Sequence, residues 1–382
     1  MPVYQLGRVG TVFVAAEAAY GTAPGLAATD AIRHLNVNLG YNPRNRVDAP
    51  VRHGHPSLVY RRTRRTTGQW SLRGEFYPSG TLNTLPDHDE ILEHGLGTKT
   101  NRALATTVAS VPTTTGATVA SAGALASGDA VLITIASGGS AGKYVRFLTN
   151  VAGAALTWAP ALPAAPAVGD AVKGCITYSL ATALAKSLNI GHYLTSLSYQ
   201  GYGAVVDQLK IQFDANNEVM WEASGPMQRR TRPAATAQPG AFTTVGATPP
   251  SGLTGGQYIS GTAVDYIKAE VTIANAMDLD NFAGGTSQAR GFFRRGKRKV
   301  EVNLNTMVSD DTTLIAAAEG TTDQTVLVQS GDTEGSIVAV YCPLVEFDVP
   351  DDPDDDETME FSFKGSAKGS IAGNDELRIA VA

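Results

Sequence analysis

The chain has 382 residues, a formal net charge of −6 and 17% charged residues, against about 25% in an average soluble domain. Its length permits two or three domains, and its negative balance argues against a protein that binds nucleic acid through the phosphates. The sparse charge suits a protein that neighbouring molecules partly cover, although a bland soluble protein has the same composition.

The cysteines and the apolar segments limit the compartment. Cys175 and Cys342 are far apart in sequence and belong to no Cys/His ligand pattern. This spacing favours buried free thiols over a disulfide or a zinc site, and it predicts a reducing compartment. No stretch has the continuous apolar run of a signal peptide or of a membrane-spanning helix. We therefore expect neither export by a standard signal nor membrane insertion.

Alternation of apolar and polar residues dominates the regular segments, and a period of two is typical of strands with one buried face. In the first part of the chain the pattern covers residues 33–40, 69–76, 209–213 and 219–223. In the last part it covers residues 266–274, 299–305, 345–349 and 359–363. Short helices are predicted at residues 87–96, where Asp87 and Asp89 can cap, and at residues 310–319. The predicted fold class is therefore mainly β.

The same elements occur twice in the same order, which predicts an internal duplication. Each copy has a strand, a long polar loop that ends in a basic cluster, a second strand, a short helix and a closing hairpin. Arg64, Arg65, Trp70 and Leu72 align without a gap with Arg294, Arg295, Val300 and Val302, and Gly225 matches Gly365. Because the identity is low, two unrelated antiparallel sheets that merely look alike stay an open alternative.

An insertion and a linker complete the predicted organisation. The stretch after residue 100 is almost uncharged, rich in Ala, Thr and Gly, and contains short strand candidates separated by turns, which predicts a small β-barrel or sandwich inserted in a surface loop. The predicted domains are a discontinuous first β domain (1–100 and 176–231), an inserted small β domain (101–175), a linker (232–256) and a second β domain (257–382).

Several segments resemble the major tail tube proteins of siphophages, the bacteriophages with long non-contractile tails. They are AAEAAYGTAP at 15–24, GQWSLRGEFYPSG at 68–80, ARGFFR at 289–294 and PLVEFDVP at 343–350. The resemblance implies tandem tail-tube β-sandwich or barrel domains, each with a flanking short helix and a long loop. It also implies a structural virion protein rather than an enzyme, with no cofactor.

The resemblance further implies an assembly. Six such domains close a ring, and rings stack head to tail into a hollow tail tube for DNA ejection. A duplicated chain would form a homotrimer with pseudo-sixfold symmetry, and a hexamer of single-barrel chains is the alternative. The expected partners are further copies of the chain, the tail terminator, the tape measure and the baseplate or tail-tip proteins, with transient passage of DNA. The expected location is the virion tail, assembled in the host cytoplasm.

Charged loops are the candidate contact sites between subunits or rings. The basic candidates are Arg61, Arg62, Arg64 and Arg65 in the first copy and Arg294, Arg295, Lys297 and Arg298 in the second. The acidic candidates are Asp351, Asp352, Asp354, Asp355 and Asp356. We expect the two signs to meet, whereas nucleic-acid contact and solvated loop tips are alternatives for the basic clusters. A calcium loop is disfavoured because Pro353 interrupts the acidic run.

Other chemistry has weaker support. His53 and His55 lack a third metal ligand at a convincing spacing, and no nucleophile elbow, phosphate-binding loop or pair of catalytic carboxylates is present. A carbohydrate-binding or adhesin β-protein is the rival function, and it would need Trp70, Trp158 and Trp221 as exposed stacking platforms. In a tube, we expect the inner face to carry acidic or small polar side chains and the inserted domain to lie outside.

Overall fold

The structure is a computed structural model, and strands dominate it. It describes residues 10–41, 46–48, 61–63, 66–184, 186–194, 197–232, 238–240, 247–281, 288–307, 312–320, 322–350, 360–371 and 373–382. Helices are short and few among them, so the predicted mainly β fold class is confirmed. Cys175 and Cys342 are buried free thiols, as predicted, and burial raises the pKa of both well above the ordinary value.

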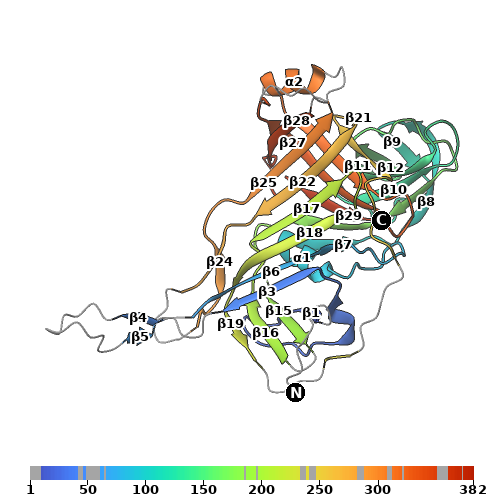
Figure 1. Ribbon diagram of the computed structural model, residues 1–382. Coiled ribbons are helices and arrows are strands. Elements are labelled where there is room, and N and C mark those ends of the chain that lie inside the picture. Colours follow the sequence, from blue (N-terminus) through green and yellow to red (C-terminus); the bar gives the residue numbers. More distant parts are fainter. Residues whose placement is uncertain are drawn as a thin grey trace.

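One long antiparallel sheet runs through both halves of the chain (Figure 1). The first strand set is, in spatial order, β3 (Asn36–Tyr41), β6 (Gly68–Glu75), β18 (Met220–Met227) and β17 (Gln208–Asp214). The second strand set continues the sheet with β22 (Tyr266–Ala274), β25 (Lys299–Met307), β28 (Glu360–Ala367) and β27 (Val338–Phe347). The order of the predicted elements is therefore the same in the two sets, and β17 joins them by pairing with β22 along its whole length.

Each strand set contains a glycine whose position opposite the neighbouring strand allows the two sets to be compared. Gly225 lies opposite Trp70 in the first set, and Gly365 lies opposite Val302 in the second. If the two glycines match, Trp70 corresponds to Val302, two residues away from the gap-free match with Val300. The strand register therefore cannot satisfy both matches expected from the sequence.

A second layer of strands covers the inner face of the long sheet. In spatial order it contains β7 (Gly97–Asn101), β14 (Ile176–Leu180), β29 (Arg378–Val381), the first half of β27, β26 (Gln324–Ser330), β20 (Gly255–Ile259) and β21 (Thr262–Val264). Apolar side chains of both layers form one core that includes Trp70, Trp221 and Ile379. Because the C-terminal strand β29 pairs with β14, both halves share this core, and the predicted domain boundaries stay a prediction.

The two predicted helices are present as α1 (Asp89–Leu96) and α2 (Thr312–Glu319). The predicted capping of α1 is wrong, because His88 is its N-cap residue and makes no side-chain capping bond. Asp87 instead pairs with Arg33 at 2.6 Å, and Asp89 accepts a bond from the Tyr178 hydroxyl at 2.7 Å. Burial of both carboxylates among donors from other elements outweighs the local capping bond.

Strands within the predicted insertion close into a six-stranded barrel of their own. They are β8 (Ala105–Thr113), β9 (Gly116–Val119), β10 (Ala130–Ile135), β11 (Gly142–Ala152), β12 (Ala155–Ala159) and β13 (Ala171–Gly174). Successive side chains of these strands point to opposite faces. Ile133 faces the barrel interior, whereas Leu132 and Phe147 pack on the outer face of the second layer. The Phe147 ring stacks on Tyr341 there, with centroids 4.9 Å apart.

The remaining strands form a side sheet and two arms. The side sheet contains β19 (Arg229–Thr231), β16 (Leu197–Ala204), β15 (Leu188–Leu194), β1 (Thr11–Ala16) and β2 (Ala31–Ile32), and the 3-10 helix η2 (Ala28–Asp30) precedes β2. The first arm, between β3 and β6, carries β4 (Arg46–Asp48) and β5 (Arg61–Thr63), and the second arm, residues 275–298, carries β23 (Met277–Leu279) and β24 (Phe292–Arg294). In Figure 1, β4 and β5 project away from the body.

Gly225 is required by a close backbone approach. A Cβ atom at this position would lie 2.0 Å from the Val205 carbonyl oxygen and 2.8 Å from the Asp207 nitrogen. We expect Gly225→Ala to lower the free energy of unfolding by about 3 kcal/mol, because the obstructing atoms belong to backbone. Gly139→Ala is the matched control, since no atom lies within 4 Å of its added Cβ. Urea denaturation of both variants checks this, and equal stabilities would contradict it.

His88 makes the first strand set sensitive to acid. It lies between Phe76 and Trp221, and burial, followed by repulsion from Arg33, lowers its pKa from 6.5 to about 3. Between these values the unfolded chain binds a proton that the folded chain excludes, so stability is present above pH 6.5 and falls as the pH drops toward 3. The limiting slope is about 1.4 kcal/mol per pH unit.

His88→Phe should therefore flatten the dependence of the unfolding free energy on pH between 6.5 and 4 relative to the parent chain. Phenylalanine keeps an aromatic ring between Phe76 and Trp221 but does not titrate. Denaturant titrations at several pH values give both slopes, and identical slopes would show that His88 is not the responsible group.

Candidate assembly interface

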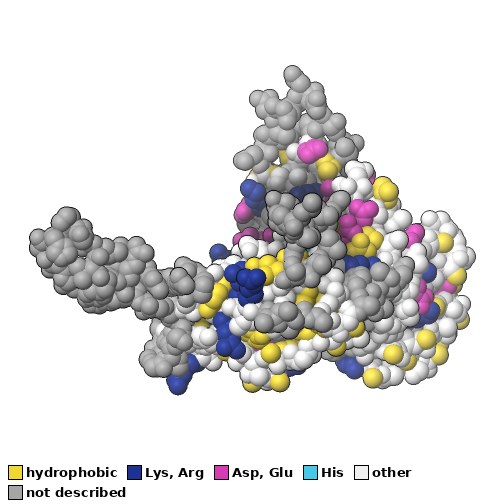
Figure 2. Space-filling view, turned by 60° about the horizontal axis from the view of Figure 1, so that its bottom comes forward, with side chains coloured by type: hydrophobic (Ala, Val, Ile, Leu, Met, Phe, Trp, Pro, Cys, Tyr) yellow, Lys and Arg dark blue, Asp and Glu magenta, His cyan; other side chains and the backbone are white. Residues whose placement is uncertain are grey.

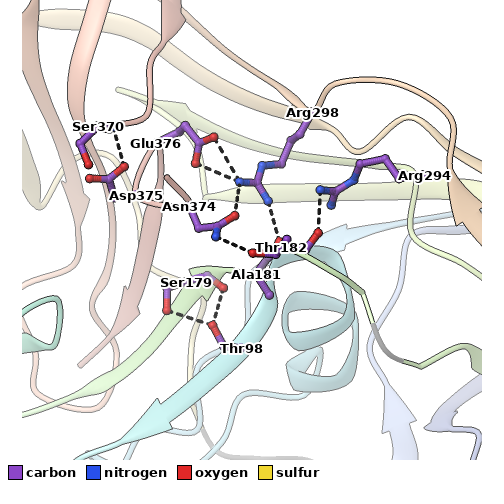
Figure 3. Close-up of polar contacts among 10 residues, drawn as sticks. All are labelled: Thr98, Ser179, Ala181, Thr182, Arg294, Arg298, Ser370, Asn374, Asp375 and Glu376. Atoms are coloured by element: carbon purple, nitrogen blue, oxygen red, sulfur yellow. Dashed lines mark hydrogen bonds and ion pairs between the residues drawn. The ribbon is translucent and has the colours of Figure 1, made fainter. Parts of the chain in front are cut away.

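Arg298 ties the second arm to the first half of the chain. Its side chain is only 6% exposed, and its guanidinium forms an ion pair with Glu376 at 2.9 Å (Figure 3). It also donates to the Ala181 carbonyl at 2.9 Å and to the Asn374 side chain at 3.1 Å. Ala181 follows β14, so one buried arginine holds together the end of the second arm, the C-terminal segment and the first half.

The other basic residues of this cluster divide into two kinds. Arg294 donates to the Thr182 carbonyl at 3.0 Å and therefore strengthens the same tie (Figure 3). Arg295 is 78% exposed and reaches Asp278 only at 3.4 Å, and Lys297 is exposed. The structure thus brings Arg294 and Arg298 together inside the chain and leaves Arg295 and Lys297 at the surface. A role of all four in contacts between chains stays a prediction.

The remaining predicted contact residues belong to β5 or lie outside the described residues. Arg61 and Arg62 belong to β5, but the structure does not describe their side chains. The other seven candidates lie outside the described residues, namely Arg64, Arg65, Asp351, Asp352, Asp354, Asp355 and Asp356. His53 and His55 also lie outside them.

Asn275 is a residue of this interface that sequence reasoning missed. Its side chain is fully buried and donates to the carbonyl of Gly95, near the end of α1, at 2.8 Å. Its backbone nitrogen donates to the Asp207 carbonyl at 2.7 Å, and the Asp207 carboxylate accepts from the Met277 nitrogen at 2.6 Å. An asparagine just after a strand is a common turn signal, so nothing in the sequence marks it as an anchor.

Apolar contacts extend the same interface. Met277 and Leu279 of β23 pack against Leu184 and Val205 of the first half. The Gln228 side chain donates to the Ala289 carbonyl at 2.7 Å. Together with the β17–β22 ladder, these contacts make the junction between the two strand sets continuous from the sheet to the second arm.

The long sheet ends in strand edges of different kinds. Among the described residues, β3 pairs only with β6, and its other edge is reached by Arg230, which donates to the Leu39 carbonyl at 2.6 Å. At the opposite end, β27 pairs with β26 as far as Val345, and no described strand pairs with that side beyond it. Two exposed apolar residues lie next to these edges, Leu35 at 61% and Val349 at 55% exposure.

The face of the long sheet that points away from the core is polar. It carries small polar residues such as Asn38 and Ser362, together with charges of both signs. Lys210 and Glu270 form an ion pair on it at 2.8 Å, and Gln212 donates to the same carboxylate at 2.9 Å. The pair lowers the pKa of Glu270 although burial opposes this. Lys210 and Lys364 lie on this face beside acidic and small polar residues, and the expectation that an acidic or small polar face lines the lumen stays a prediction.

Rival chemistry finds little support in the described residues. Trp70, Trp158 and Trp221 are each at most 2% exposed, so they cannot serve as sugar-stacking platforms in this fold. Within the same residues no group of three or more His, Cys, Asp and Glu could hold a metal ion. None of the helices in the described parts of the chain is long and apolar enough to cross a membrane.

Taken together, the repeated strand order, the unlike sheet edges and the polar sheet face define a β-protein whose long sheet leaves two edges without a strand partner among the described residues. The family model described as phage tail tube protein matches residues 7–367, nearly the whole chain. The chain therefore belongs to the phage tail tube protein family and is a structural component of the virion tail. No curated protein matches the sequence.

Substitutions of the buried Arg298 and the exposed Arg295 test whether the Arg298 contacts hold the two halves of the chain together. Arg298→Met keeps the apolar stem but leaves the Glu376 carboxylate without its buried partner, so the free energy of unfolding should fall by about 3 kcal/mol. Arg295→Met at the exposed position should change it by less than about 0.5 kcal/mol. Thermal or urea unfolding measures both, and a neutral Arg298→Met would show that the cluster does not hold the halves together.

Proposed function

We propose that the chain polymerises into stacked rings that form the tail tube of a siphophage, through which DNA is ejected into the host. The observation that carries this proposal is the long sheet, in which one four-strand order occurs twice head to tail. A head-to-tail contact that repeats around an axis closes into a ring and removes exposed strand edges, which would otherwise promote aggregation.

A homotrimer follows from the two strand sets per chain. Three chains would supply six sets, and a ring of pseudo-sixfold symmetry arises if the contact between chains copies the contact within the chain. The alternative is a hexamer of single-barrel chains. Six chains with two strand sets each would place twelve sets in a wider ring, in which junctions within chains alternate with junctions between chains. The shared strand order of the two sets favours the trimer.

The layers of the fold suggest which side faces the bore. Among the described residues the long sheet has a polar outer face, whereas the barrel packs on the outer face of the second layer through Leu132 and Phe147. A lumen lined by the long sheet would present small polar residues and charges of both signs to DNA, without a purely positive surface that retains phosphates. The barrel would then lie on the outside of the tube.

The outer position also suits the surface of the barrel. In Figure 2 the right-hand part of the molecule, where Figure 1 places the barrel, is mainly white and yellow with few charged side chains. We propose assembly in the host cytoplasm, with the tail terminator, the tape measure and the baseplate or tail-tip proteins as partners. We assign no catalytic reaction and no cofactor to the chain.

Negative-stain microscopy of the purified full-length chain tests the proposal directly. Filaments of uniform width with an axial hole are expected, and end views should display threefold symmetry with six similar lobes. A chain that stays monomeric at high concentration would overturn the proposed function, whereas a ring of six chains would overturn only the trimer.

The acidic run supplies a prediction about stacking. Asp354→Lys, Asp355→Lys and Asp356→Lys in one variant should abolish tubes while the subunit stays folded, because like charges would then meet the basic clusters. Microscopy reports tube formation and circular dichroism reports the fold. Lys364→Glu, a charge reversal on the polar face of β28, is the control that should still assemble. Normal tubes from the triple variant would contradict the contact.

A further inference from the structure

We infer that the junction between neighbouring chains is a copy of the β17–β22 junction inside the chain, with β3 of one chain pairing with residues 348–350 of another. This inference rests on the proposed ring and specifies the strands and the register that close it. Its partner is a second copy of this chain.

The internal junction gives the register. Lys210 lies opposite Thr272, and the seven-residue ladder runs from Gln208 opposite Ala274 to Asp214 opposite Lys268. The Asp207 carbonyl accepts from the Asn275 nitrogen and the Ile267 carbonyl accepts from the Ala215 nitrogen, so odd-numbered residues of β17 are the hydrogen-bonded ones. Lys210 and Thr272 are therefore a non-hydrogen-bonded pair on the polar face.

The residues that lie opposite Gly365 and Gly225 allow this register to be transferred to the two free edges. In the second set, Gly365 opposes Phe347 and Val302, and Val302 opposes Val271. In the first set, Gly225 opposes Trp70, and Trp70 opposes Leu39.

Matching the rows gives the equivalent positions. Leu39 corresponds to Val271, and Gly40 therefore corresponds to Thr272. On the other strand, Asp348, whose nitrogen bonds the Lys364 carbonyl, corresponds to Gln208, and Pro350 corresponds to Lys210. The copied junction thus places Gly40 of one chain opposite Pro350 of the next.

The two edges have the properties that this pairing needs. Both are without a strand partner among the described residues, and the exposed side chains of Leu35 and Val349 flank them. In the internal junction the position equivalent to Leu35 is Ile267, whose carbonyl bonds Ala215. Pairing with a neighbour would cover Leu35 and Val349 in the same way.

Before assembly, Arg230 occupies a hydrogen-bonding position on the free edge of β3. Its guanidinium occupies the Leu39 carbonyl, and the equivalent Val271 faces Ile211 of β17 in the internal junction. The incoming strand must displace this arginine, which is a common way in which charged side chains protect an edge strand from indiscriminate pairing. This contact explains how a free subunit can keep the β3 edge from indiscriminate pairing until the edge closes a ring.

The positions of the two arms also support a junction between chains that copies the internal β17–β22 junction. The second arm leaves the sheet after β22 and packs on the first strand set through Asn275 and Met277. The first arm leaves the sheet after β3 at the equivalent point, and its β4–β5 ladder has the same length as the β23–β24 ladder. Its strands β4 and β5 project from the body in Figure 1, as expected for strands whose docking surface belongs to another chain.

Cysteine pairs test the register. Gly40→Cys with Pro350→Cys should form a disulfide between chains, because a non-hydrogen-bonded antiparallel pair brings the two Cα atoms to about 4.5 Å. Gly40 tolerates the change, since the nearest atom to an added Cβ is 3.4 Å away. Lys210→Cys with Thr272→Cys is the matched control at the internal junction, and Asn36→Cys with Pro350→Cys is the out-of-register control.

Assembled tubes are oxidised, denatured without reductant and analysed by gel electrophoresis. The Gly40/Pro350 pair should give covalent trimers as the largest major species, the internal pair only monomers, and the out-of-register pair no cross-link. Tubes that assemble but yield no Gly40/Pro350 cross-link, or a cross-link only in the out-of-register pair, would overturn this inference and leave the proposed function intact. Failure of the parent chain to form tubes would instead overturn the proposed function.

Discussion

The antiparallel ladder between β17 and β22 is the constraint on which the rest of the structure depends. It makes one sheet of two strand sets that have the same internal order, so the two ends of the sheet differ from each other. Pairing of one end with the unlike end of another chain is a head-to-tail association, which closes into a ring when the rotation per step divides a full turn. The ladder therefore determines the fold and creates the two unlike ends that such an association would use.

The elements that obey local rules could be predicted from the sequence. Alternation located the strands of the long sheet, and helical spacing located α1 and α2 to within two residues. The continuity of the sheet could not be predicted, because period-two patterns show that a strand has two faces but not which strand lies beside it. The conflict between the gap-free match and the glycine match likewise became visible only from the strand register.

The basic clusters show a second limit of sequence reasoning. Four neighbouring cations suggest one surface patch, yet Arg298 is buried against Glu376 while Arg295 is exposed. The difference arises from the C-terminal segment, which brings Glu376 and Asn374 to one side of the loop only. Asn275, the most deeply buried polar anchor of the junction, carried no signal, because its partners are backbone carbonyls distant in sequence.

The barrel is compatible with ring closure because of the layer on which it packs. Its contacts go to the second layer, where Arg146 is fully buried beside Tyr258 and the Gln329 side chain bonds the backbone of β11. Burial lowers the pKa of Arg146, and backbone carbonyls at 2.8 and 3.2 Å with an aromatic face compensate the charge. None of these contacts uses the edges or the polar face of the long sheet. An insertion of this size can therefore enter the chain between β7 and β14 without altering the junctions on which assembly would depend.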